Sequence, residues 1–255
     1  MSYERNPYES SKYGAEATTW EGYGMPASQA AEDERTAFIR RTYLHLLGAV
    51  VAFVLIEAAI FMLVPRESLD QVVLTMFGGR WSWLIVLGAF MGVSWLARSW
   101  ASSDTSVGMQ YAGLALYVVA QAVIFLPLLV IAVFYSGQPS LLPAAGALTL
   151  FIFAGLTAVM FFTKADMSFL GKYLMFGGIA AMGLIALGIF FQFSLGFWFA
   201  AAMVVLCSGY ILYDTSNVIH HYRTDQHVAA ALALFASVAL LLWYIIQILM
   251  TLNRR

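Results

Sequence analysis

Four polar side chains in an otherwise apolar segment are the residues best suited to chemistry in this chain. Tyr210, Asp214, Asn217 and His221 are spaced so that they lie along one face of a helix. An acid within a membrane-spanning helix costs roughly 2.5–3.5 kcal/mol to insert, so its presence predicts a functional site. We expect the stripe to face the bundle interior or a water-filled crevice, where Asp214 could exchange a proton for a cation. A buried acid satisfied by interhelical hydrogen bonds is the structural alternative.

Two further charged residues could act with Asp214. Glu57 is the only other acid deep within an apolar stretch, and it is either protonated and hydrogen-bonded or lines the same cavity as Asp214. Arg98, at the end of the second apolar stretch, is a candidate partner for Asp214 by its expected depth alone. Both residues are therefore candidates for an ion pathway or a pH sensor.

Histidines gather beside the loop that follows the polar stripe. His220, His221 and His227 flank Asp225, and histidine changes its charge between about pH 5 and 8. These residues could add pH sensitivity, although solvated loop histidines are the simpler interpretation. The spacings typical of zinc sites do not occur in the sequence, and the single cysteine, Cys207, excludes an internal disulfide.

The sequence carries no pattern that predicts an enzyme or a bound cofactor. An intramembrane protease would need two buried aspartates on neighbouring helices to activate water. Asp214 supplies one of them, but Asp166 lies in a loop between apolar stretches and so at the wrong depth. Glycine-rich pieces such as Gly177-Gly178 lack the strand that precedes a nucleotide-binding turn.

The composition is that of a membrane protein with several spans. Hydrophobic residues make up 62% of the chain, charged residues 11%, and the mean hydropathy is +0.80, whereas soluble domains contain about 25% charged residues. A net charge of −1 gives no basic surface for nucleic acid. The predicted partners are therefore the lipid bilayer, small cations or protons, and another membrane protein.

Seven stretches approach or exceed the length of about 20 residues that a spanning helix needs. They cover approximately 44–64, 82–99, 110–135, 143–163, 173–192, 197–219 and 229–250. Pro127 is expected to kink the third of them. The sequence thus predicts an all-α membrane protein with one seven-helix domain over 36–255.

The first 35 residues are polar and contain no apolar core of a cleavable signal peptide. We expect a disordered cytoplasmic tail over 1–35, with disorder to about Ala30 and a short helix compatible with the acids at Glu32-Asp33-Glu34.

Lysine and arginine in the short loops predict the orientation. The residues of one side are Arg35, Arg40, Arg41, Arg98, Lys164, Lys172 and Arg223. Because such residues favour the cytoplasmic side, we expect the N-terminus there. Arg254 and Arg255 conflict with this orientation if the last segment crosses fully.

Two stretches resemble the Bax inhibitor-1 family. One is Gly155-Leu156-Thr157 with Thr163-Lys164-Ala165-Asp166-Met167-Ser168-Phe169-Leu170-Gly171, which is similar to the family's fourth-span exit. The other is Leu212-Tyr213-Asp214-Thr215-Ser216-Asn217-Val218-Ile219-His220, which is close to the family signature. The resemblance covers roughly 36–250. It implies six helices around a central, hydrophobic seventh, and a pH-sensitive calcium leak.

The resemblance also implies a latch of paired acids on the sixth and seventh helices. Asp214 matches the first acid, whereas the second aligns with Ser237, and an asparagine frequent three residues later becomes Leu240. A lone Asp214 would titrate singly rather than as a coupled pair. It would also be a weak calcium ligand, because calcium favours about six to eight oxygens.

Two classes of function follow from these observations. The first is a pH-sensitive calcium or cation leak of the bacterial inner membrane, with Asp214 as the titrating acid and calcium only as the transported ion. The alternative is a non-conducting regulator that binds membrane proteases or stress-response proteins through its tail and helix surfaces.

Overall fold

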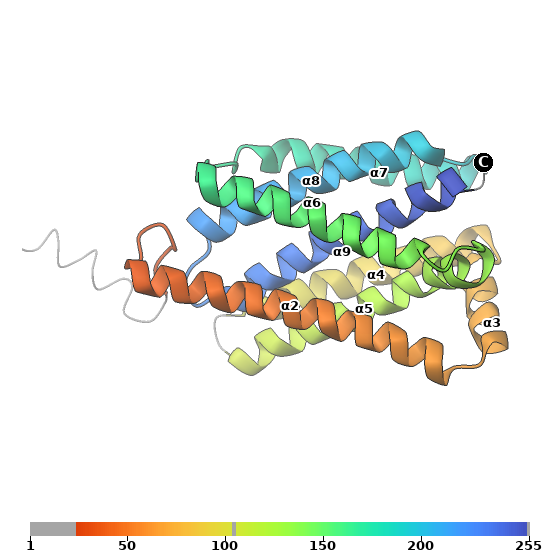
Figure 1. Ribbon diagram of the computed structural model, residues 1–255, viewed down its shortest axis with the longest axis horizontal. Helices are drawn as coiled ribbons and strands as arrows, with labels where there is room; N and C mark the ends of the chain where they lie inside the picture. Colours follow the sequence, from red (N-terminus) through yellow and green to blue (C-terminus); the bar gives the residue numbers. More distant parts are fainter. Residues whose placement is uncertain (1–23, 104–105, 254–255) are drawn as a thin grey trace, which may run out of the picture.

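The computed structural model describes residues 24–103 and 106–253 (Figure 1). Within these residues, the elements in chain order are α2 (Glu32–Leu63), α3 (Arg66–Phe77), α4 (Arg80–Ala101), α5 (Val107–Val130), the π-helical turn η1 (Ile131–Tyr135), α6 (Leu141–Thr163), α7 (Leu170–Phe191), α8 (Gly196–His220) and α9 (His227–Asn253). All of these elements are helical, as the apolar stretches predict.

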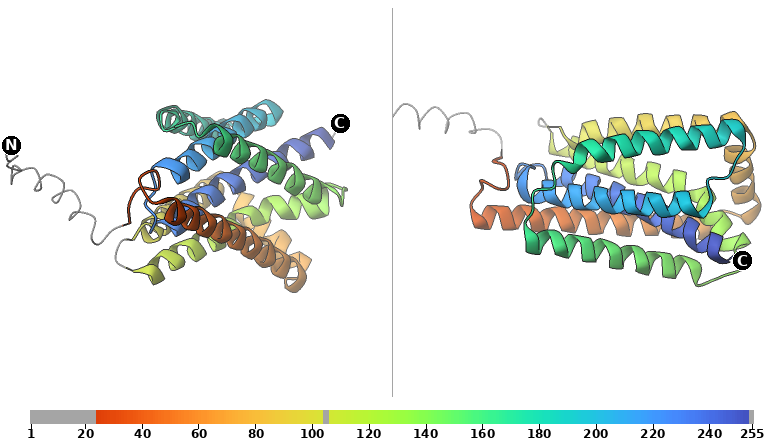
Figure 2. Two further views of the ribbon diagram at one scale, coloured as in Figure 1. Left: turned by 60° about the vertical axis from the view of Figure 1, so that its left-hand side comes forward. Right: turned by 90° about the horizontal axis from the view of Figure 1, so that it is seen from above.

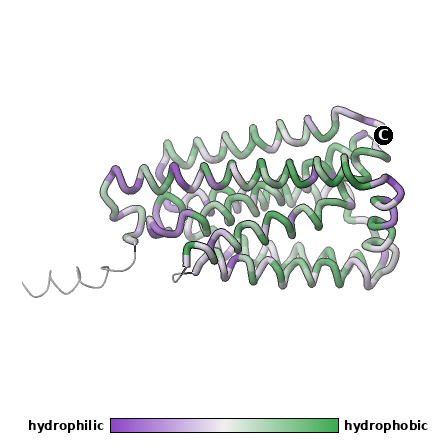
Figure 3. The backbone as a smooth tube through the Cα atoms, turned by 90° about the horizontal axis from the view of Figure 1, so that it is seen from below, coloured by the Kyte–Doolittle hydropathy of each residue, from purple (hydrophilic) through white to green (hydrophobic). Residues whose placement is uncertain are grey.

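Seven long helices run side by side in alternating directions, and each is long and apolar enough to cross a membrane (Figure 1). They correspond one to one with the seven predicted stretches, although α2 begins at Glu32 and is much longer than predicted. The short α3 lies across one end of the bundle, which we call the α3 end. The other end, where α2 begins, is called the N-terminal end. Hydrophilic residues gather at both ends, with hydrophobic residues between them (Figure 3).

α9 is the central helix of the bundle, as the family resemblance implies. It contacts α2, α4, α5, α6 and α8, and it passes through the middle of the molecule (Figure 2). Small residues over Ala229–Ala233 let neighbouring backbones approach it closely. α7 lies outside this ring and packs mainly on α8.

α9 crosses the whole bundle. It begins at the N-terminal end, and Asn253 donates a hydrogen bond of 2.7 Å from Nδ2 to Oε1 of Gln138 at the α3 end. The first and last residues of the helical domain therefore lie at opposite ends of the bundle. Arg254 and Arg255 lie outside the described residues.

Pro127 does not end the helix that contains it. α5 continues to Val130 and then widens into η1, where Ser136 Oγ donates to the carbonyl oxygen of Ala132 over 2.5 Å. Proline removes one backbone donor, so a local change of helical type is a common way to accommodate it in a membrane helix.

Residues 24–31 form an ordered segment, which we call the N-terminal strap, where a disordered tail was predicted. The Ala27 amide donates to the Tyr222 carbonyl at 2.9 Å, and the Thr224 amide donates to the Met25 carbonyl at 3.0 Å. Ala27 is fully buried. The prediction was wrong here because backbone pairing with the α8–α9 loop, rather than an apolar face, holds the segment. The short helix expected near Glu32 is instead the first part of the 32-residue α2, and residues 1–23 lie outside the described residues.

Gly113 lets α5 touch the backbone of α4. A Cβ atom at this position would lie 2.5 Å from the Ala97 carbonyl oxygen and 2.5 Å from the Ala101 amide nitrogen. Because both neighbours are backbone atoms of a helix, neither can move away without displacing α4.

Gly113→Ala should therefore separate α4 from α5 and destabilise the protein. The expected loss is about 1–3 kcal/mol, or roughly 2–10 °C in thermal midpoint, measured by thermal unfolding in detergent. Gly88→Ala in α4 is the matched control, since a Cβ there meets nothing within 4 Å. Equal midpoints for the two variants would contradict the close approach.

Candidate functional site

Asp214 occupies one position of the apolar face that α8 turns toward α9. The buried residues of this face are Ala200, Met203, Cys207, Ile211, Asp214 and Val218, at helical spacing. Asp214 is 8% exposed, so its carboxylate replaces an apolar side chain in a tightly packed seam between two helices. A carboxyl group in such a seam needs a polar partner on the facing helix.

Ser237 on α9 supplies that partner. Its Oγ donates to Oδ2 of Asp214 over 2.5 Å, and Ser237 is itself only 6% exposed. The pairing that the family alignment suggests is therefore present as a contact. This hydrogen bond joins the central helix to the helix that carries the family signature, and we call it the Asp214–Ser237 pair.

Tyr210 does not join Asp214, contrary to the stripe prediction. Its hydroxyl donates to the Leu174 carbonyl of α7 at 2.9 Å. Two residues that are four positions apart, such as Tyr210 and Asp214, point in directions that differ by about 40° around the helix axis. Because α8 lies between α7 and α9, that rotation is enough to direct Tyr210 and Asp214 to different neighbours.

His221 also leaves the predicted stripe. Its Nε2 lies 3.2 Å from Oδ1 of Asp166 in the α6–α7 loop, and both side chains are about half exposed. Asp166 also accepts the Ser168 backbone N–H, and this bond, followed by the contact with His221, lowers the pKa of Asp166 from 3.8 to about 2. The stabilising contribution of Asp166 is therefore complete above pH 4 and is lost only as the pH falls toward 2.

Arg98 plays another part than the predicted one, whereas the place of the Asn217 side chain in the polar stripe stays a prediction. The backbone carbonyl of Asn217 accepts the amides of His221 and Tyr222 at the end of α8. The Arg98 guanidinium lies 5.6 Å from the centre of the Tyr117 ring. It acts on Asp214 through its charge but forms no ion pair with it, so a direct Arg98–Asp214 contact was a wrong expectation.

Glu57 lies in a different seam from Asp214. It belongs to α2, is 6% exposed, and neither of its oxygens has a hydrogen-bond partner among the described residues. Phe53, one turn before it, packs on Phe125 of α5 and Phe235 of α9. Neither expectation for Glu57 fits this placement. It lies in another seam than Asp214, and the expected hydrogen bond to its carboxyl group is not found among the described residues.

The described residues contain no group of three or more His, Cys, Asp or Glu side chains that could hold a metal ion. The Asp214–Ser237 pair offers one carboxylate and one hydroxyl, which is far short of the oxygen set of a tight calcium site. The pair by itself therefore does not make a tight cation site.

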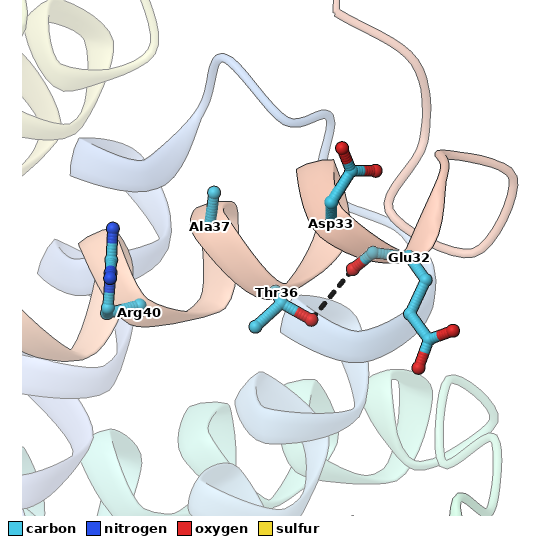
Figure 4. Close-up of a pocket in the computed structure, with 5 residues that line it drawn as sticks. All are labelled: Glu32, Asp33, Thr36, Ala37 and Arg40. Carbon is cyan, nitrogen blue, oxygen red and sulfur yellow. Dashed lines mark hydrogen bonds between the residues drawn. The ribbon is translucent and has the colours of Figure 1, made fainter.

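A shallow surface depression at the N-terminal end contains none of the predicted site residues. It is lined by Glu32, Asp33, Thr36, Ala37 and Arg40 (Figure 4). All five belong to the start of α2, and the Thr36 hydroxyl is already engaged with the Glu32 carbonyl oxygen at 2.7 Å. A depression formed by one helix with charges of both signs does not define a ligand site.

His45 is a polar residue of the N-terminal end that sequence reasoning missed. Its Nε2 lies 2.9 Å from the Tyr111 hydroxyl of α5, and its ring centre lies 4.9 Å from that of His227 on α9. These three residues are far apart in the chain, so no local pattern could have connected them.

The fold and the site together define a class of protein. It is a seven-span helical membrane protein in which a buried acid is hydrogen-bonded to the central helix. A family profile described as "Inhibitor of apoptosis-promoting Bax1" matches residues 35–255. The chain therefore belongs to the Bax inhibitor-1 family.

Three relatives show how the similarity is distributed. Bax inhibitor 1 of Schizosaccharomyces pombe is 28% identical over 227 residues, which cover 88% of this chain and 80% of the yeast protein. Protein PA2604 of Pseudomonas aeruginosa is 34% identical over 118 residues, 45% of this chain and about half (53%) of that protein. "Modulator of FtsH protease YccA" of Escherichia coli is 36% identical over 91 residues, 35% of this chain and 41% of YccA.

Ser237→Ala should destabilise the protein, because it removes the hydroxyl that satisfies a buried carboxyl group. The expected loss is about 1–2 kcal/mol, measured as a lower thermal midpoint in detergent. Ser208→Ala is the matched control, since the Ser208 hydroxyl donates only within α8, to the Val204 carbonyl at 2.8 Å. A Ser237→Ala variant as stable as Ser208→Ala would show that the pair does not hold α8 to α9.

Proposed function

We propose that this protein is a pH-dependent cation leak, with calcium as the expected ion and the Asp214–Ser237 pair as its latch. The observation that carries the proposal is the 2.5 Å hydrogen bond between these two side chains inside the membrane-spanning bundle. Membership of the Bax inhibitor-1 family supports it. We place the protein in a bacterial-type inner membrane, as the name "Inner membrane protein YccA" says of a relative, with the N-terminus in the cytoplasm.

The direction of the pH response follows from opposing effects. The first is attraction: ionised Asp214 would accept a stronger hydrogen bond from Ser237 than the neutral acid would, by about 1–2 kcal/mol, and the charge of Arg98 acts in the same direction. Against this, keeping a charged carboxylate in the dry seam costs several kcal/mol, and hydration in an open seam removes that cost. The second effect is larger, so ionisation of Asp214 favours the separation of α8 and α9, and protonation favours the closed latch.

Calcium flux into dye-loaded proteoliposomes should therefore rise with pH as Asp214 ionises. Asp214→Asn, which is always neutral, should abolish this rise and hold the flux near the closed level. Ser237→Asp should spread the pH response over two separate steps, because two adjacent carboxyl groups share a proton and titrate as a coupled pair.

Asp166→Asn is the matched control for this experiment. Asp166 is exposed, and its pKa of about 2 keeps it ionised across the whole range of the assay. This variant should leave the pH profile unchanged. Flux equal to that of empty vesicles at every pH would eliminate the leak.

A second candidate function is the modulation of a membrane protease. The likeness to YccA, a protein named as a modulator of FtsH protease, favours it. The N-terminal strap adds a structural reason. It is bonded to the loop that connects Asp214 on α8 with Ser237 on α9, so a protein bound to the preceding residues could act on the same pair.

For this second function, a membrane protease of the FtsH type should degrade a membrane substrate at a different rate when the protein is co-reconstituted. A variant that lacks residues 1–23 but keeps the strap should lose at least half of that effect, whereas Asp214→Asn should retain it. An unchanged degradation rate with the full-length chain would remove this candidate, and dependence on Asp214 alone would point back to the leak.

A further inference from the structure

Glu57 is a buried acid that takes no part in the proposed latch. Its carboxyl group is 6% exposed, and both oxygens are buried without a hydrogen-bond partner among the described residues. An isolated buried carboxylate costs several kcal/mol, whereas each unpartnered atom of the neutral acid costs about 1–3 kcal/mol. The sealed structure therefore accommodates Glu57 far better with a proton than without one.

The helices that cover Glu57 supply no counter-charge. It lies on the face of α2 that carries the buried residues Phe53 and Phe38, and this face packs on α5 and α9. The sequences of α5 and α9 contain no Lys, Arg, Asp or Glu. Their titratable residues away from the N-terminal end are Tyr117, which contacts Phe235, and Tyr244, which contacts Phe199 of α8.

Arg66 and Asp70 of α3, the helix that follows α2, are paired with one another. Arg66 pairs with Asp70 at 3.7 Å and lies over the Phe134 ring at 4.8 Å. Asp70 also accepts the Tyr135 hydroxyl at 3.0 Å. Phe61, one turn beyond Glu57, packs on Phe134. Along α2, Glu57 thus lies between the aromatic contacts of Phe53 and Phe61. The Arg66–Asp70 ion pair lies beyond the contact of Phe61.

Glu57 and Asp214 lie on opposite sides of the central helix. Phe235 faces Phe53 on the α2 side of α9, while Ser237, two residues later, faces Asp214 on the α8 side. Two residues along a helix correspond to a rotation of about 200°. The body of α9 therefore separates the two acids, and neither can serve as the other's partner in this arrangement.

We propose that Glu57 is a second proton-binding site, independent of the Asp214–Ser237 pair, which exchanges its proton with the α3 side of the membrane. Glu57 is six residues from the end of α2 at Leu63, which is about 9 Å along the helix, whereas the start of α2 is about 38 Å away. The ligand is a proton rather than a metal ion, because no other acid or histidine completes a metal site among the described residues.

A hydrophobic carbodiimide tests the site directly. The hydroxyl of a protonated carboxyl group adds across one C=N bond of dicyclohexylcarbodiimide, and the O-acylisourea rearranges to a stable N-acylurea with no leaving group. The full-length protein in nanodiscs is treated over a series of pH values, and the adduct on the Glu57 peptide is quantified by mass spectrometry. Labelling should fall about tenfold for each pH unit above the midpoint of the Glu57 titration.

Three variants control the labelling experiment. Glu57→Gln should lose the adduct on this peptide. If this variant does not fold, Glu57→Asp replaces it and should keep the adduct with a changed titration midpoint. Asp214→Asn should leave the Glu57 midpoint unchanged, since α9 separates the two sites. In proteoliposomes of known orientation, labelling should follow the pH on the α3 side.

Three outcomes would overturn the proposal. They are the absence of an adduct on Glu57 at any pH, labelling that follows the pH of the N-terminal side, and a midpoint that moves with Asp214→Asn. Because labelling needs no ion flux, a failure of the leak proposal leaves this test intact, and a failure here leaves the leak proposal intact.

Discussion

The burial of α9 inside the other helices is the constraint on which the rest of the structure depends. A helix covered on most sides, within a membrane that offers no water, must be apolar nearly all round, and each polar group it keeps must find a partner on a neighbour. α9 meets the first condition with Ala, Leu, Val and Ile along its length. Ser237 meets the second by donating to Asp214. The same bond therefore satisfies a buried carboxyl group and fixes the register of α8 on α9.

The helices of this fold could be predicted because a span in lipid leaves a signal within one short window. Length and hydropathy alone located all seven, and α2 differs mainly because its polar first turns carry no such signal. The central position of α9 needed the family resemblance. Contacts between distant segments were not predictable. The N-terminal strap is held by backbone bonds to Tyr222 and Thr224, which any sequence could form, so its order was missed.

The candidate site was predictable only where a resemblance supplied the partner. Asp214 stands out in the sequence by its chemistry, but its pairing with Ser237 came from alignment. Helical spacing alone placed Tyr210 and His221 beside Asp214, and the structure directs them to α7 and to the α6–α7 loop. Periodicity shows which residues share a face. It does not show that a face in a crowded bundle is divided between two neighbours.

A serine at position 237 changes what the seam can do. With an acid at this position, two carboxyl groups would share one proton while the seam is closed. In an open seam they would offer two pairs of oxygens to a cation, so that binding of the cation would be coupled to release of the proton. One carboxyl group and one hydroxyl carry at most one charge, so in the proposed leak a cation at Asp214 would have to keep most of its water. Glu57 cannot replace the missing acid, because α9 lies between the two. The closed bundle thus holds two single acids in separate seams, and any coupling between them must pass through movement of α9 itself.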